Sequence, residues 1–462
     1  MQYETRMSDA DALMWNIEKD PILRSTITAV AVLDRCPDRD ALLFRLDRGT
    51  RLIPRMRQRV VGNPYSIAPP RWEVDPHFDL RYHVRFVHAG GDGTLRDVLD
   101  IAEPIGMQGF DRARPLWEFV VVEGLEDGRA AIIQKVHHAI TDGVGGMQMV
   151  MTMIDLEREP AATDEELPPA PIAESMGPVR RTADALGHLR RRNLGIAKRA
   201  GGTLAAAATT AVTDPVSVLG GLGATVGSIG RLLAPTPTPL SPIMAKRSLS
   251  FRFQALAFPL PELKAAAKAG GGTLNDAFVA GVAGGLHRYH ERHGVEVEAL
   301  RMTMPINVRT EGTADVAGNQ FVPARFTVPV AIDDPAEHMQ AIHALVDQQR
   351  HEPANALVEP LAIVLNRLPT TAVTALFGSM IKGSDFTTSN VPGAPIPIYI
   401  AGAQVEAMIP FGPLAGVALN VTLLSNLDDV HIGINSDMAA VPDPEVLLEC
   451  MRESFEAVLK QA

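Results

Sequence analysis

The 462-residue sequence contains few cysteines and no long apolar segment. The two cysteines, Cys36 and Cys450, lie far apart, which excludes a closely spaced metal or redox motif and favours ordinary thiols in a reducing compartment. Because no uninterrupted run of about twenty apolar residues occurs, we predict no membrane-spanning helix. The N-terminus has no basic region followed by an apolar core, so we predict no secretory signal and expect a cytoplasmic protein.

Basic residues are outnumbered by acidic ones. The formal net charge of −11 argues against nucleic acid as a partner. The apolar fraction of 46% and the charged fraction of 21% are typical of an ordered globular protein. A chain of this length exceeds the usual size of one hydrophobic core, so we predict two domains.

Strand and helix patterns mix in both halves, which predicts an α/β or α+β class. Residues 1–158 form the first predicted domain and residues 247–462 the second. Between them, residues 159–246 pass through acidic, proline-rich, basic and Ala/Gly/Thr-rich stretches, which is typical of a linker that is partly helical and mobile.

Apolar periodicity and turn residues predict the individual elements. In the first domain we predict helices after a capping pair at Ser8 and Asp11 and over 38–49 and 147–157, with strands at 26–33, within 71–87, from 117 and over 130–136. In the second we predict strands at 248–258, 300–305 and 321–330, an extended segment at 385–400 and a hairpin around 426–429. Helices are predicted after a cap at Thr273, in two stretches of 335–380 and over 443–460.

The segment HHAITDG, residues 137–143, follows the strand at 130–136. Neighbouring side chains of a strand point to opposite faces, so one histidine can face a cleft while the other forms hydrogen bonds inside. A general base that Asp142 orients, a metal site and a polar turn all remain open. The metal interpretation is disfavoured because adjacent strand residues are poor ligands and no third histidine follows at a useful spacing, so we predict no metal.

A second group of histidines, His287, His290 and His293, is spaced three residues apart near a predicted helix end. This spacing could bind a metal, but we favour a solvated helix terminus.

HHAITDG matches the HHxxxDG signature of the CoA-dependent acyltransferase superfamily. Further segments make the chain similar to the bacterial wax ester synthase/diacylglycerol acyltransferase family. They span roughly residues 8–393: MSDADALMW, Pro115-Leu116-Trp117, the Asn275-Asp276 pair, MPINVR at 304–309, Gly318-Asn319 and SNVPG at 389–393. One position departs from the family, because Ser241 stands where members often carry an asparagine whose role is local packing or contact with the acceptor.

The resemblance implies a fold of two chloramphenicol-acetyltransferase-like domains with mixed sheets and an active site in a channel at their interface. It implies that His138 is the general base and that His137 and Asp142 support it. Asp142 is either an orienting partner or a brace of the loop, and we favour the brace. The backbone N–H of Gly143 and the side chain of Asn275 are the expected donors to the oxyanion.

Asp276, Ser389 and Asn390 are further residues that the resemblance implies for substrate binding. Each motif also has a purely structural interpretation. Asn275-Asp276 could serve only to begin a helix, SNVPG could be a turn that supports packing, and Trp117 could be a core residue.

The resemblance finally implies transfer of a long-chain acyl group from acyl-CoA to diacylglycerol or a long-chain alcohol, with no cofactor because acyl-CoA is a substrate. The alternatives are a condensation-type enzyme that uses a carrier protein and a catalytically weak lipid-binding relative. We expect acyl-CoA and a lipid acceptor as partners. The basic stretch 180–199 could touch a membrane or lipid droplet from the cytoplasmic side, or could be an ordinary solvated helix. Chain length, acceptor preference and oligomeric state are not readable from the sequence.

Overall fold

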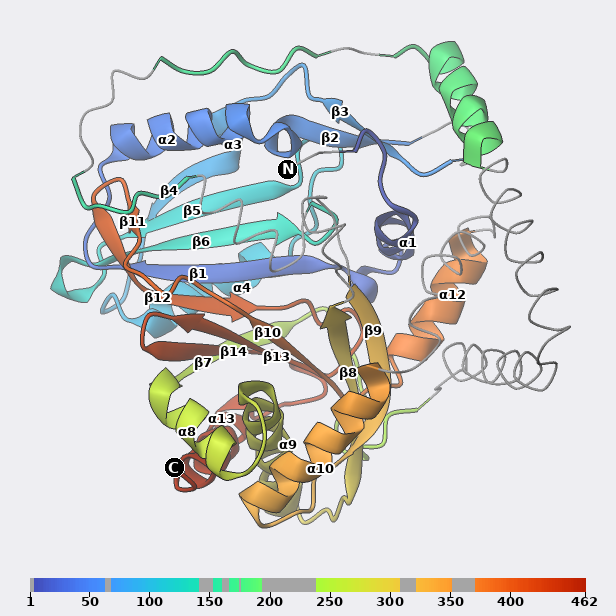
Figure 1. The fold of residues 1–462 in the computed structure, drawn as a ribbon. Coiled ribbons are helices and arrows are strands. Elements are labelled where there is room, and N and C mark those ends of the chain that lie inside the picture. The colour runs from blue at the N-terminus through green and yellow to red at the C-terminus, as the bar shows by residue number, and fades with distance from the viewer. Residues whose placement is uncertain are drawn as a thin grey trace, which may run out of the picture.

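The computed structural model describes residues 4–62, 68–140, 153–159, 166–173, 176–192, 238–307, 321–350 and 370–462. These residues form two mixed six-stranded sheets, which lie one above the other in Figure 1. The predicted two-domain α/β architecture with mixed sheets is therefore confirmed. Within these ranges no helix is long and apolar enough to cross a membrane.

The first sheet has the strand order β11-β12-β1-β6-β5-β4. β4 and β5 are parallel and the other neighbours are antiparallel. Its strands are β1 (Thr26–Leu33), β4 (Val84–His88), β5 (Trp117–Glu123), β6 (Ala130–His137), β11 (Tyr399–Ile400) and β12 (Ala403–Phe411). The predicted strands at 26–33, 130–136 and after residue 116 are confirmed.

Short helices and a two-stranded ribbon surround this sheet. Ser8 begins the first helix as predicted, because its side chain accepts a hydrogen bond from the N–H of Asp11. The elements are α1 (Asp9–Ile17), η1 (Pro21–Leu23), α2 (Arg39–Leu52), η2 (Pro54–Arg57), β2 (Gln58–Val61), β3 (Arg71–Val74), α3 (Leu80–His83), α4 (Leu95–Met107) and η4 (Glu126–Gly128).

The second sheet has the order β7-β14-β13-β10-β8-β9, with β10 parallel to both of its neighbours. Its strands are β7 (Phe251–Pro259), β8 (Ala299–Asn307), β9 (Phe321–Pro329), β10 (Phe386–Val391), β13 (Leu419–Asn426) and β14 (Asp429–Asp437). The helices are α8 (Leu260–Ala269), α9 (Leu274–Arg292), α10 (Pro335–Arg350), α12 (Thr370–Ile381) and α13 (Pro444–Leu459). The predicted hairpin and closing helix are thus confirmed.

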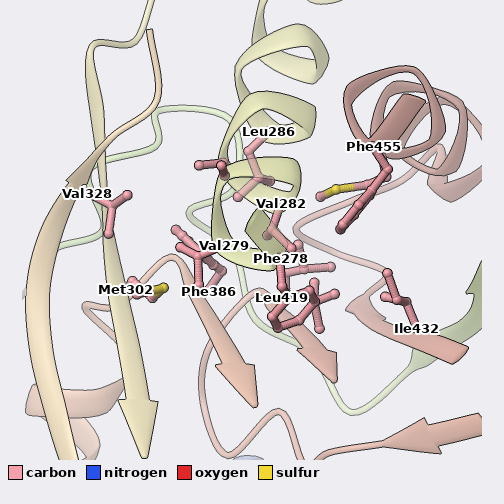
Figure 2. Close-up of a cluster of buried hydrophobic side chains, with 14 of the residues drawn as sticks. Phe278, Val279, Val282, Leu286, Met302, Val328, Phe386, Leu419, Ile432 and Phe455 are labelled. Atoms are coloured by element: carbon pink, nitrogen blue, oxygen red, sulfur yellow. The ribbon is translucent and has the colours of Figure 1, made fainter. Parts of the chain in front are cut away.

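Helix α9 forms the centre of the second core. Figure 2 shows Phe278, Val282 and Leu286 of this helix near Phe386 and Leu419 of the sheet. All five side chains are fully buried. Burial of this apolar face, rather than helix propensity, holds α9 in place, since the helix contains several glycines and β-branched residues.

Strand β12 links the two halves of the molecule. It comes from the C-terminal part of the chain but pairs with β1 of the first sheet. It crosses β14 so closely that a Cβ on Gly433 would lie 1.8 Å from the carbonyl oxygen of Pro410. The boundaries 1–158, 159–246 and 247–462 remain predictions, but the first sheet takes two of its strands from the last of these segments.

The helix predicted over 147–157 is wrong for those of its residues that the structure describes. Residues 153–157 belong to the helix predicted over 147–157, yet they form a turn, a β-bridge between Asp155 and Tyr399, and a bend. The rest of that prediction lies outside the described residues. Within the predicted linker, residues 178–192 form a helix, as the expected partial helicity requires.

Candidate active site

The two adjacent histidines lie where β6 ends beside the start of β1. His137 is the last residue of the strand, and His138 already belongs to a turn in which the N–H of Ile140 donates to the carbonyl oxygen of His137 at 2.9 Å. The N–H of His138 donates to the carbonyl oxygen of Ser25 at 2.9 Å. His137 is 1% exposed and His138 is half-buried, so the predicted difference between the two environments is confirmed. Asp142 and Gly143 lie outside the described residues.

Hydrogen bonds fix the ring of His137 on both sides. The N–H of Ala139 donates to its Nδ1 at 3.0 Å, so Nδ1 carries no proton. The opposite nitrogen, Nε2, therefore carries the proton and donates to Oε1 of Glu18 at 2.9 Å. Trp15 packs edge-on against the ring at 5.4 Å between centroids. Both ring nitrogens of His137 therefore take part in hydrogen bonds, and the supporting role expected for this residue stays a prediction.

Glu18 is a buried carboxylate with several donors. Its Oε1 also accepts the N–H of Ser25 at 2.7 Å, and Arg112 lies 3.7 Å from Oε2. Burial raises the pKa of the Glu18 carboxyl, but the interaction with His137 and the hydrogen bonds from His137 and Ser25 outweigh this effect and hold the pKa below its ordinary value. No local sequence motif marks Glu18, so its place beside the histidines was not predicted.

A second buried ion pair lies on the same strand. Lys135 is fully buried two residues before His137, and its Nζ lies 3.3 Å from Oε1 of Glu118 on β5. Burial lowers the pKa of the Lys135 ammonium, while Glu118 acts in the opposite sense. Successive odd positions of β6 share one face, so Lys135 and His137 point to the same side of the sheet. The lysine inside the apolar strand β6 and the glutamate near the start of the preceding strand β5 were the sequence signal for this pair.

An open cleft between the two sheets reaches the neighbourhood of the histidines. Thr26, which lines it, pairs directly with His137 across β1 and β6. The cleft is lined by Pro21, Ile22, Arg24, Thr26, Thr28, Gly106, Met107, Ser248, Leu249, Phe251, Phe253, Phe411, 413–417, Asn435 and Asp437. Its wall combines stacked phenylalanines, Phe253 and Phe411 at 4.1 Å between centroids, with several polar groups.

Asn435 on β14 is one of the buried polar residues that the second sheet contributes to that wall. It is 3% exposed, and its Nδ2 donates to the carbonyl oxygen of Gly412 at 2.9 Å. Its Oδ1 has no hydrogen-bond partner among the described residues. An acceptor of this kind suits the hydroxyl or amide N–H of a ligand in the cleft.

Ser389 and Asn390 lie on opposite faces of β10. Thr387 of β10 pairs with Asn420 of β13, and Asn420 pairs in turn with Asn435 of the cleft wall. Ser389 follows Thr387 by two residues, so the two side chains leave the same face of the sheet. Ser389 therefore lies on the face of the second sheet that carries the cleft, whereas Asn390 starts from the opposite, helix-covered face. The prediction of a turn at SNVPG is wrong for its first residues, which belong to the strand.

Asn275 and Asp276 lie in the first turn of α9. Asp276 is 2% exposed and completes a capping box, since it accepts hydrogen bonds from the N–H and hydroxyl of Thr273 at 2.8 Å. It also binds Nδ1 of His343 at 2.8 Å. Asn275 places its Nδ2 3.9 Å from the sulfur of Met304. The contacts of Asp276 are those of helix-start chemistry, and the substrate role of Asn275 stays a prediction.

Comparison with known proteins identifies the family. The wax ester synthase/diacylglycerol acyltransferase catalytic domain matches residues 7–278, and the C-terminal domain of the same family matches residues 317–458. The chain belongs to the wax ester synthase/diacylglycerol acyltransferase family. It is thus an acyltransferase by family, as the resemblance implied.

Curated relatives agree with this assignment. A putative diacylglycerol O-acyltransferase of Mycobacterium tuberculosis is 41% identical over 461 residues, which is 99% of this chain and 93% of that protein. A second one from the same species is 30% identical over 99% of this chain and 97% of its own length.

Two solved structures share the fold. A wax ester synthase/diacylglycerol acyltransferase of Marinobacter aquaeolei VT8 gives a TM-score of 0.64 at 22% identity over 98% of both chains. The first condensation domain of the calcium-dependent antibiotic synthetase gives 0.63 at 14% identity over 98% of this chain and 95% of that one.

Other family motifs have structural tasks here. Trp117 of the PLW motif is 1% exposed, donates from Nε1 to the carbonyl oxygen of Met56 at 2.8 Å and stacks on His83. The interpretation of Trp117 as a core residue is confirmed. Ser241, which replaces the usual asparagine, is buried and its hydroxyl bonds Nε2 of His290 at 2.7 Å, so this position serves local packing.

The histidines near the end of α9 do not form one solvated group. His290 is fully buried between Ser241 and the carbonyl oxygen of Leu286, which corrects the expectation of a solvated terminus for that residue. His293 bonds Asp443 at 3.0 Å. In the part of the chain that the structure describes, no three His, Cys, Asp or Glu side chains are grouped so that they could hold a metal ion.

Proposed function

We propose that this family member transfers a long-chain acyl group from acyl-CoA to diacylglycerol or to a long-chain alcohol, with His138 as the general base. The observation that carries the proposal is the placement of a half-buried histidine beside a rigidly held one, at the strand end where the cleft between the sheets begins. The names of the relatives, diacylglycerol O-acyltransferase and wax ester synthase, support the choice of acceptors.

The reaction needs only one proton carrier. His138 accepts the proton of the acceptor hydroxyl as the hydroxyl oxygen attacks the thioester carbonyl carbon. When the tetrahedral intermediate collapses, the carbon–sulfur bond breaks, the ester is formed and the sulfur of coenzyme A receives the proton from His138. A positioned base of this kind contributes about 10²–10⁴-fold to the rate. No acyl-enzyme is formed, because the nucleophile is the acceptor's own oxygen.

The negative oxygen of the intermediate needs preorganised donors. We assign this task to the backbone N–H of Gly143 and to the side-chain amide of Asn275, each worth about 3–4 kcal/mol in comparable sites. Asp142 is proposed as a brace of the loop that carries Gly143. Of the second-sheet residues, Ser389 is favoured over Asn390 as a contact of the substrate, because Ser389 shares the face of the cleft wall.

Incubation of the purified protein with labelled long-chain acyl-CoA tests the function. Separate reactions receive diacylglycerol, hexadecanol or no acceptor, and the lipids are then separated. We expect a labelled triacylglycerol or wax ester only where an acceptor is present. Absence of ester in every reaction would contradict the proposal and favour a donor bound to a carrier protein, or a lipid-binding protein without activity.

The exposed side of the helix at residues 178–192 suits a lipid surface. Ion pairs hold its inner side, because Asp184 binds both Arg6 and Arg71. Its outer side carries Val179, which is 83% exposed, Leu186, which is 53% exposed, and exposed arginines at 180 and 190. We propose that this side touches anionic lipid at the inner face of the membrane or at lipid inclusions.

Vesicle flotation tests the proposed lipid contact. The protein should float with phosphatidylglycerol vesicles, and replacement of the arginines at 180 and 190 by glutamine should reduce the bound fraction severalfold. Equal binding by both proteins would contradict the assignment of this helix.

A further inference from the structure

We propose that Glu18 is a positioning residue for acyl transfer, because a single carboxylate oxygen fixes both chain segments that hold His138. The inference rests on the proposed function, in which His138 is the base. Glu18 does not touch the reacting atoms in this scheme. It acts through its two hydrogen-bond donors, Ser25 and His137, each of which is also hydrogen-bonded to the segment 138–139.

The first connection runs through Ser25. Its N–H donates to Oε1 of Glu18 at 2.7 Å, and its carbonyl oxygen accepts the N–H of His138 at 2.9 Å. The peptide groups of one residue thus join the Glu18 carboxylate to the main chain of His138. Loss of the carboxylate would leave the Ser25 N–H without its acceptor and free this segment to shift.

The second connection runs through His137. Its Nε2–H donates to the same Oε1 at 2.9 Å, and its Nδ1 accepts the N–H of Ala139 at 3.0 Å. The ring therefore binds the residue that follows His138, and Glu18 determines which nitrogen carries the proton. If the ring turned or changed tautomer, Nδ1 would no longer accept from Ala139 and the turn around His138 would lose its support.

The position of Glu18 is unfavourable for a purely structural acid. It immediately follows α1, where the helix dipole and free carbonyl groups repel a negative charge. Its side chain is only 8% exposed, so the carboxylate is also poorly hydrated. A carboxylate in this place contributes little to the helix, whereas its hydrogen bonds to Ser25 and His137 give it a clear task beside the base.

Two substitutions separate geometry from charge. Both hydrogen bonds end on one oxygen, so the carbonyl oxygen of Glu18→Gln can accept both while the charge is lost. Glu18→Ala removes the acceptor. We expect Glu18→Ala to lower kcat about 10- to 100-fold, because small displacements of a catalytic group have effects of this size. The KM for acyl-CoA should change less than about threefold, and Glu18→Gln should keep kcat within about fivefold of the wild type.

Glu103 offers a matched control. Its side chain is 10% exposed, against 8% for Glu18, and its Oε1 accepts a buried backbone N–H, that of Phe253, at 3.0 Å. In the described part of the chain no hydrogen bond or ion pair joins Glu103 to the histidine segment. Glu103→Ala should lower the melting temperature at least as much as Glu18→Ala, while kcat stays within about threefold. If Glu18→Ala does not fold, Glu18→Asp replaces it, because its shorter side chain cannot reach both donors and should lose rate where Glu18→Gln does not.

Each outcome supports or overturns the inference. An inactive wild type with every acceptor refutes the proposed function and is recognised before any variant is measured. With an active wild type, a kcat of Glu18→Ala within threefold of normal overturns the role of Glu18. Equal losses of kcat in Glu18→Gln and Glu18→Ala overturn the geometric explanation. If Glu103→Ala loses as much kcat as Glu18→Ala, the loss comes from lowered stability in general and the role of Glu18 is overturned.

Discussion

At the scale of single residues, the histidine pair illustrates how adjacent identical side chains acquire different tasks. His137 is enclosed by Glu18, Ala139 and Trp15, so its ring cannot turn. His138 lies one residue further, after the strand has ended, and its ring is half-buried. The chemical difference comes from the end of β6 rather than from the residue type.

The pair at the start of α9 separates a structural acid from a proposed substrate contact. Asp276→Ala removes the capping box and the His343 contact, so we expect the free energy of unfolding to fall by about 1–2 kcal/mol. Asn275→Ala should leave stability within about 0.5 kcal/mol but lower kcat about 10²-fold or more if Asn275 is an oxyanion donor. Urea unfolding and steady-state kinetics measure the two effects. A normal kcat in Asn275→Ala would remove Asn275 from the site.

The helix caps and strand ends that place single residues were largely predictable from the sequence, because they depend on local interactions. The caps at Ser8 and Thr273 and the end of the strand before His138 each depend on a few neighbouring residues. Glu18 was not predictable, since it lies 119 positions from His137 and only the fold brings them together. The same holds for Ser241 and His290, whose hydrogen bond depends on how two distant segments pack.

At the scale of elements, β12 shows what apolar periodicity does not reveal. Residues 403–411 leave the second half of the chain and extend the first sheet, and the neighbour of a strand depends on the entire topology. Residues 153–157 show the opposite error, since their apolar side chains suggested a helix that the surrounding structure does not form.

The crossing of β12 over β14 gives a test of this arrangement. Gly433→Ala would place a methyl group 1.8 Å from the carbonyl oxygen of Pro410, so the strands must separate. We expect a loss of about 1–3 kcal/mol in the free energy of unfolding. Gly62→Ala is the control, because a Cβ there meets no atom of the described residues within 4 Å, and it should be neutral or stabilising by up to about 1 kcal/mol. Equal stabilities of the two variants in urea unfolding would argue against the close crossing.

At the scale of the whole molecule, several neutral histidines are buried in both halves. They are His83, His290, His338 and His431. Burial lowers the pKa of each of them below the ordinary value of 6.5. The folded protein therefore takes up these protons less readily than the unfolded chain does.

This difference predicts how stability depends on pH. Below about pH 6.5 these histidines become protonated in the unfolded chain but stay neutral in the folded protein. The free energy of unfolding therefore falls as the pH decreases. Above that pH the full contribution is present. Each such histidine costs up to about 1.4 kcal/mol per pH unit. Urea unfolding at pH 7.5, 6.5 and 5.5 measures the trend, and a constant free energy over this range would contradict it.

The whole-molecule architecture was predictable only in part. The mixture of helices and strands in a chain of this length predicted two α/β domains, and the resemblance added the type of fold. Two features depend on long-range packing that no local pattern encodes. They are the pairing of β12 with the first sheet and the apolar cluster that Val373 of α12 forms with residues of α1 and with Leu23.

The central claim is that His138 carries the proton in acyl transfer, and the variant His138→Ala tests it most directly. The measurement is the initial rate of ester formation from labelled long-chain acyl-CoA with the preferred acceptor, together with the melting temperature. We predict a rate lowered about 10²–10⁴-fold and a melting temperature close to that of the wild type, because the half-buried ring supports the reaction more than the fold. A folded His138→Ala protein with the full rate would contradict the account.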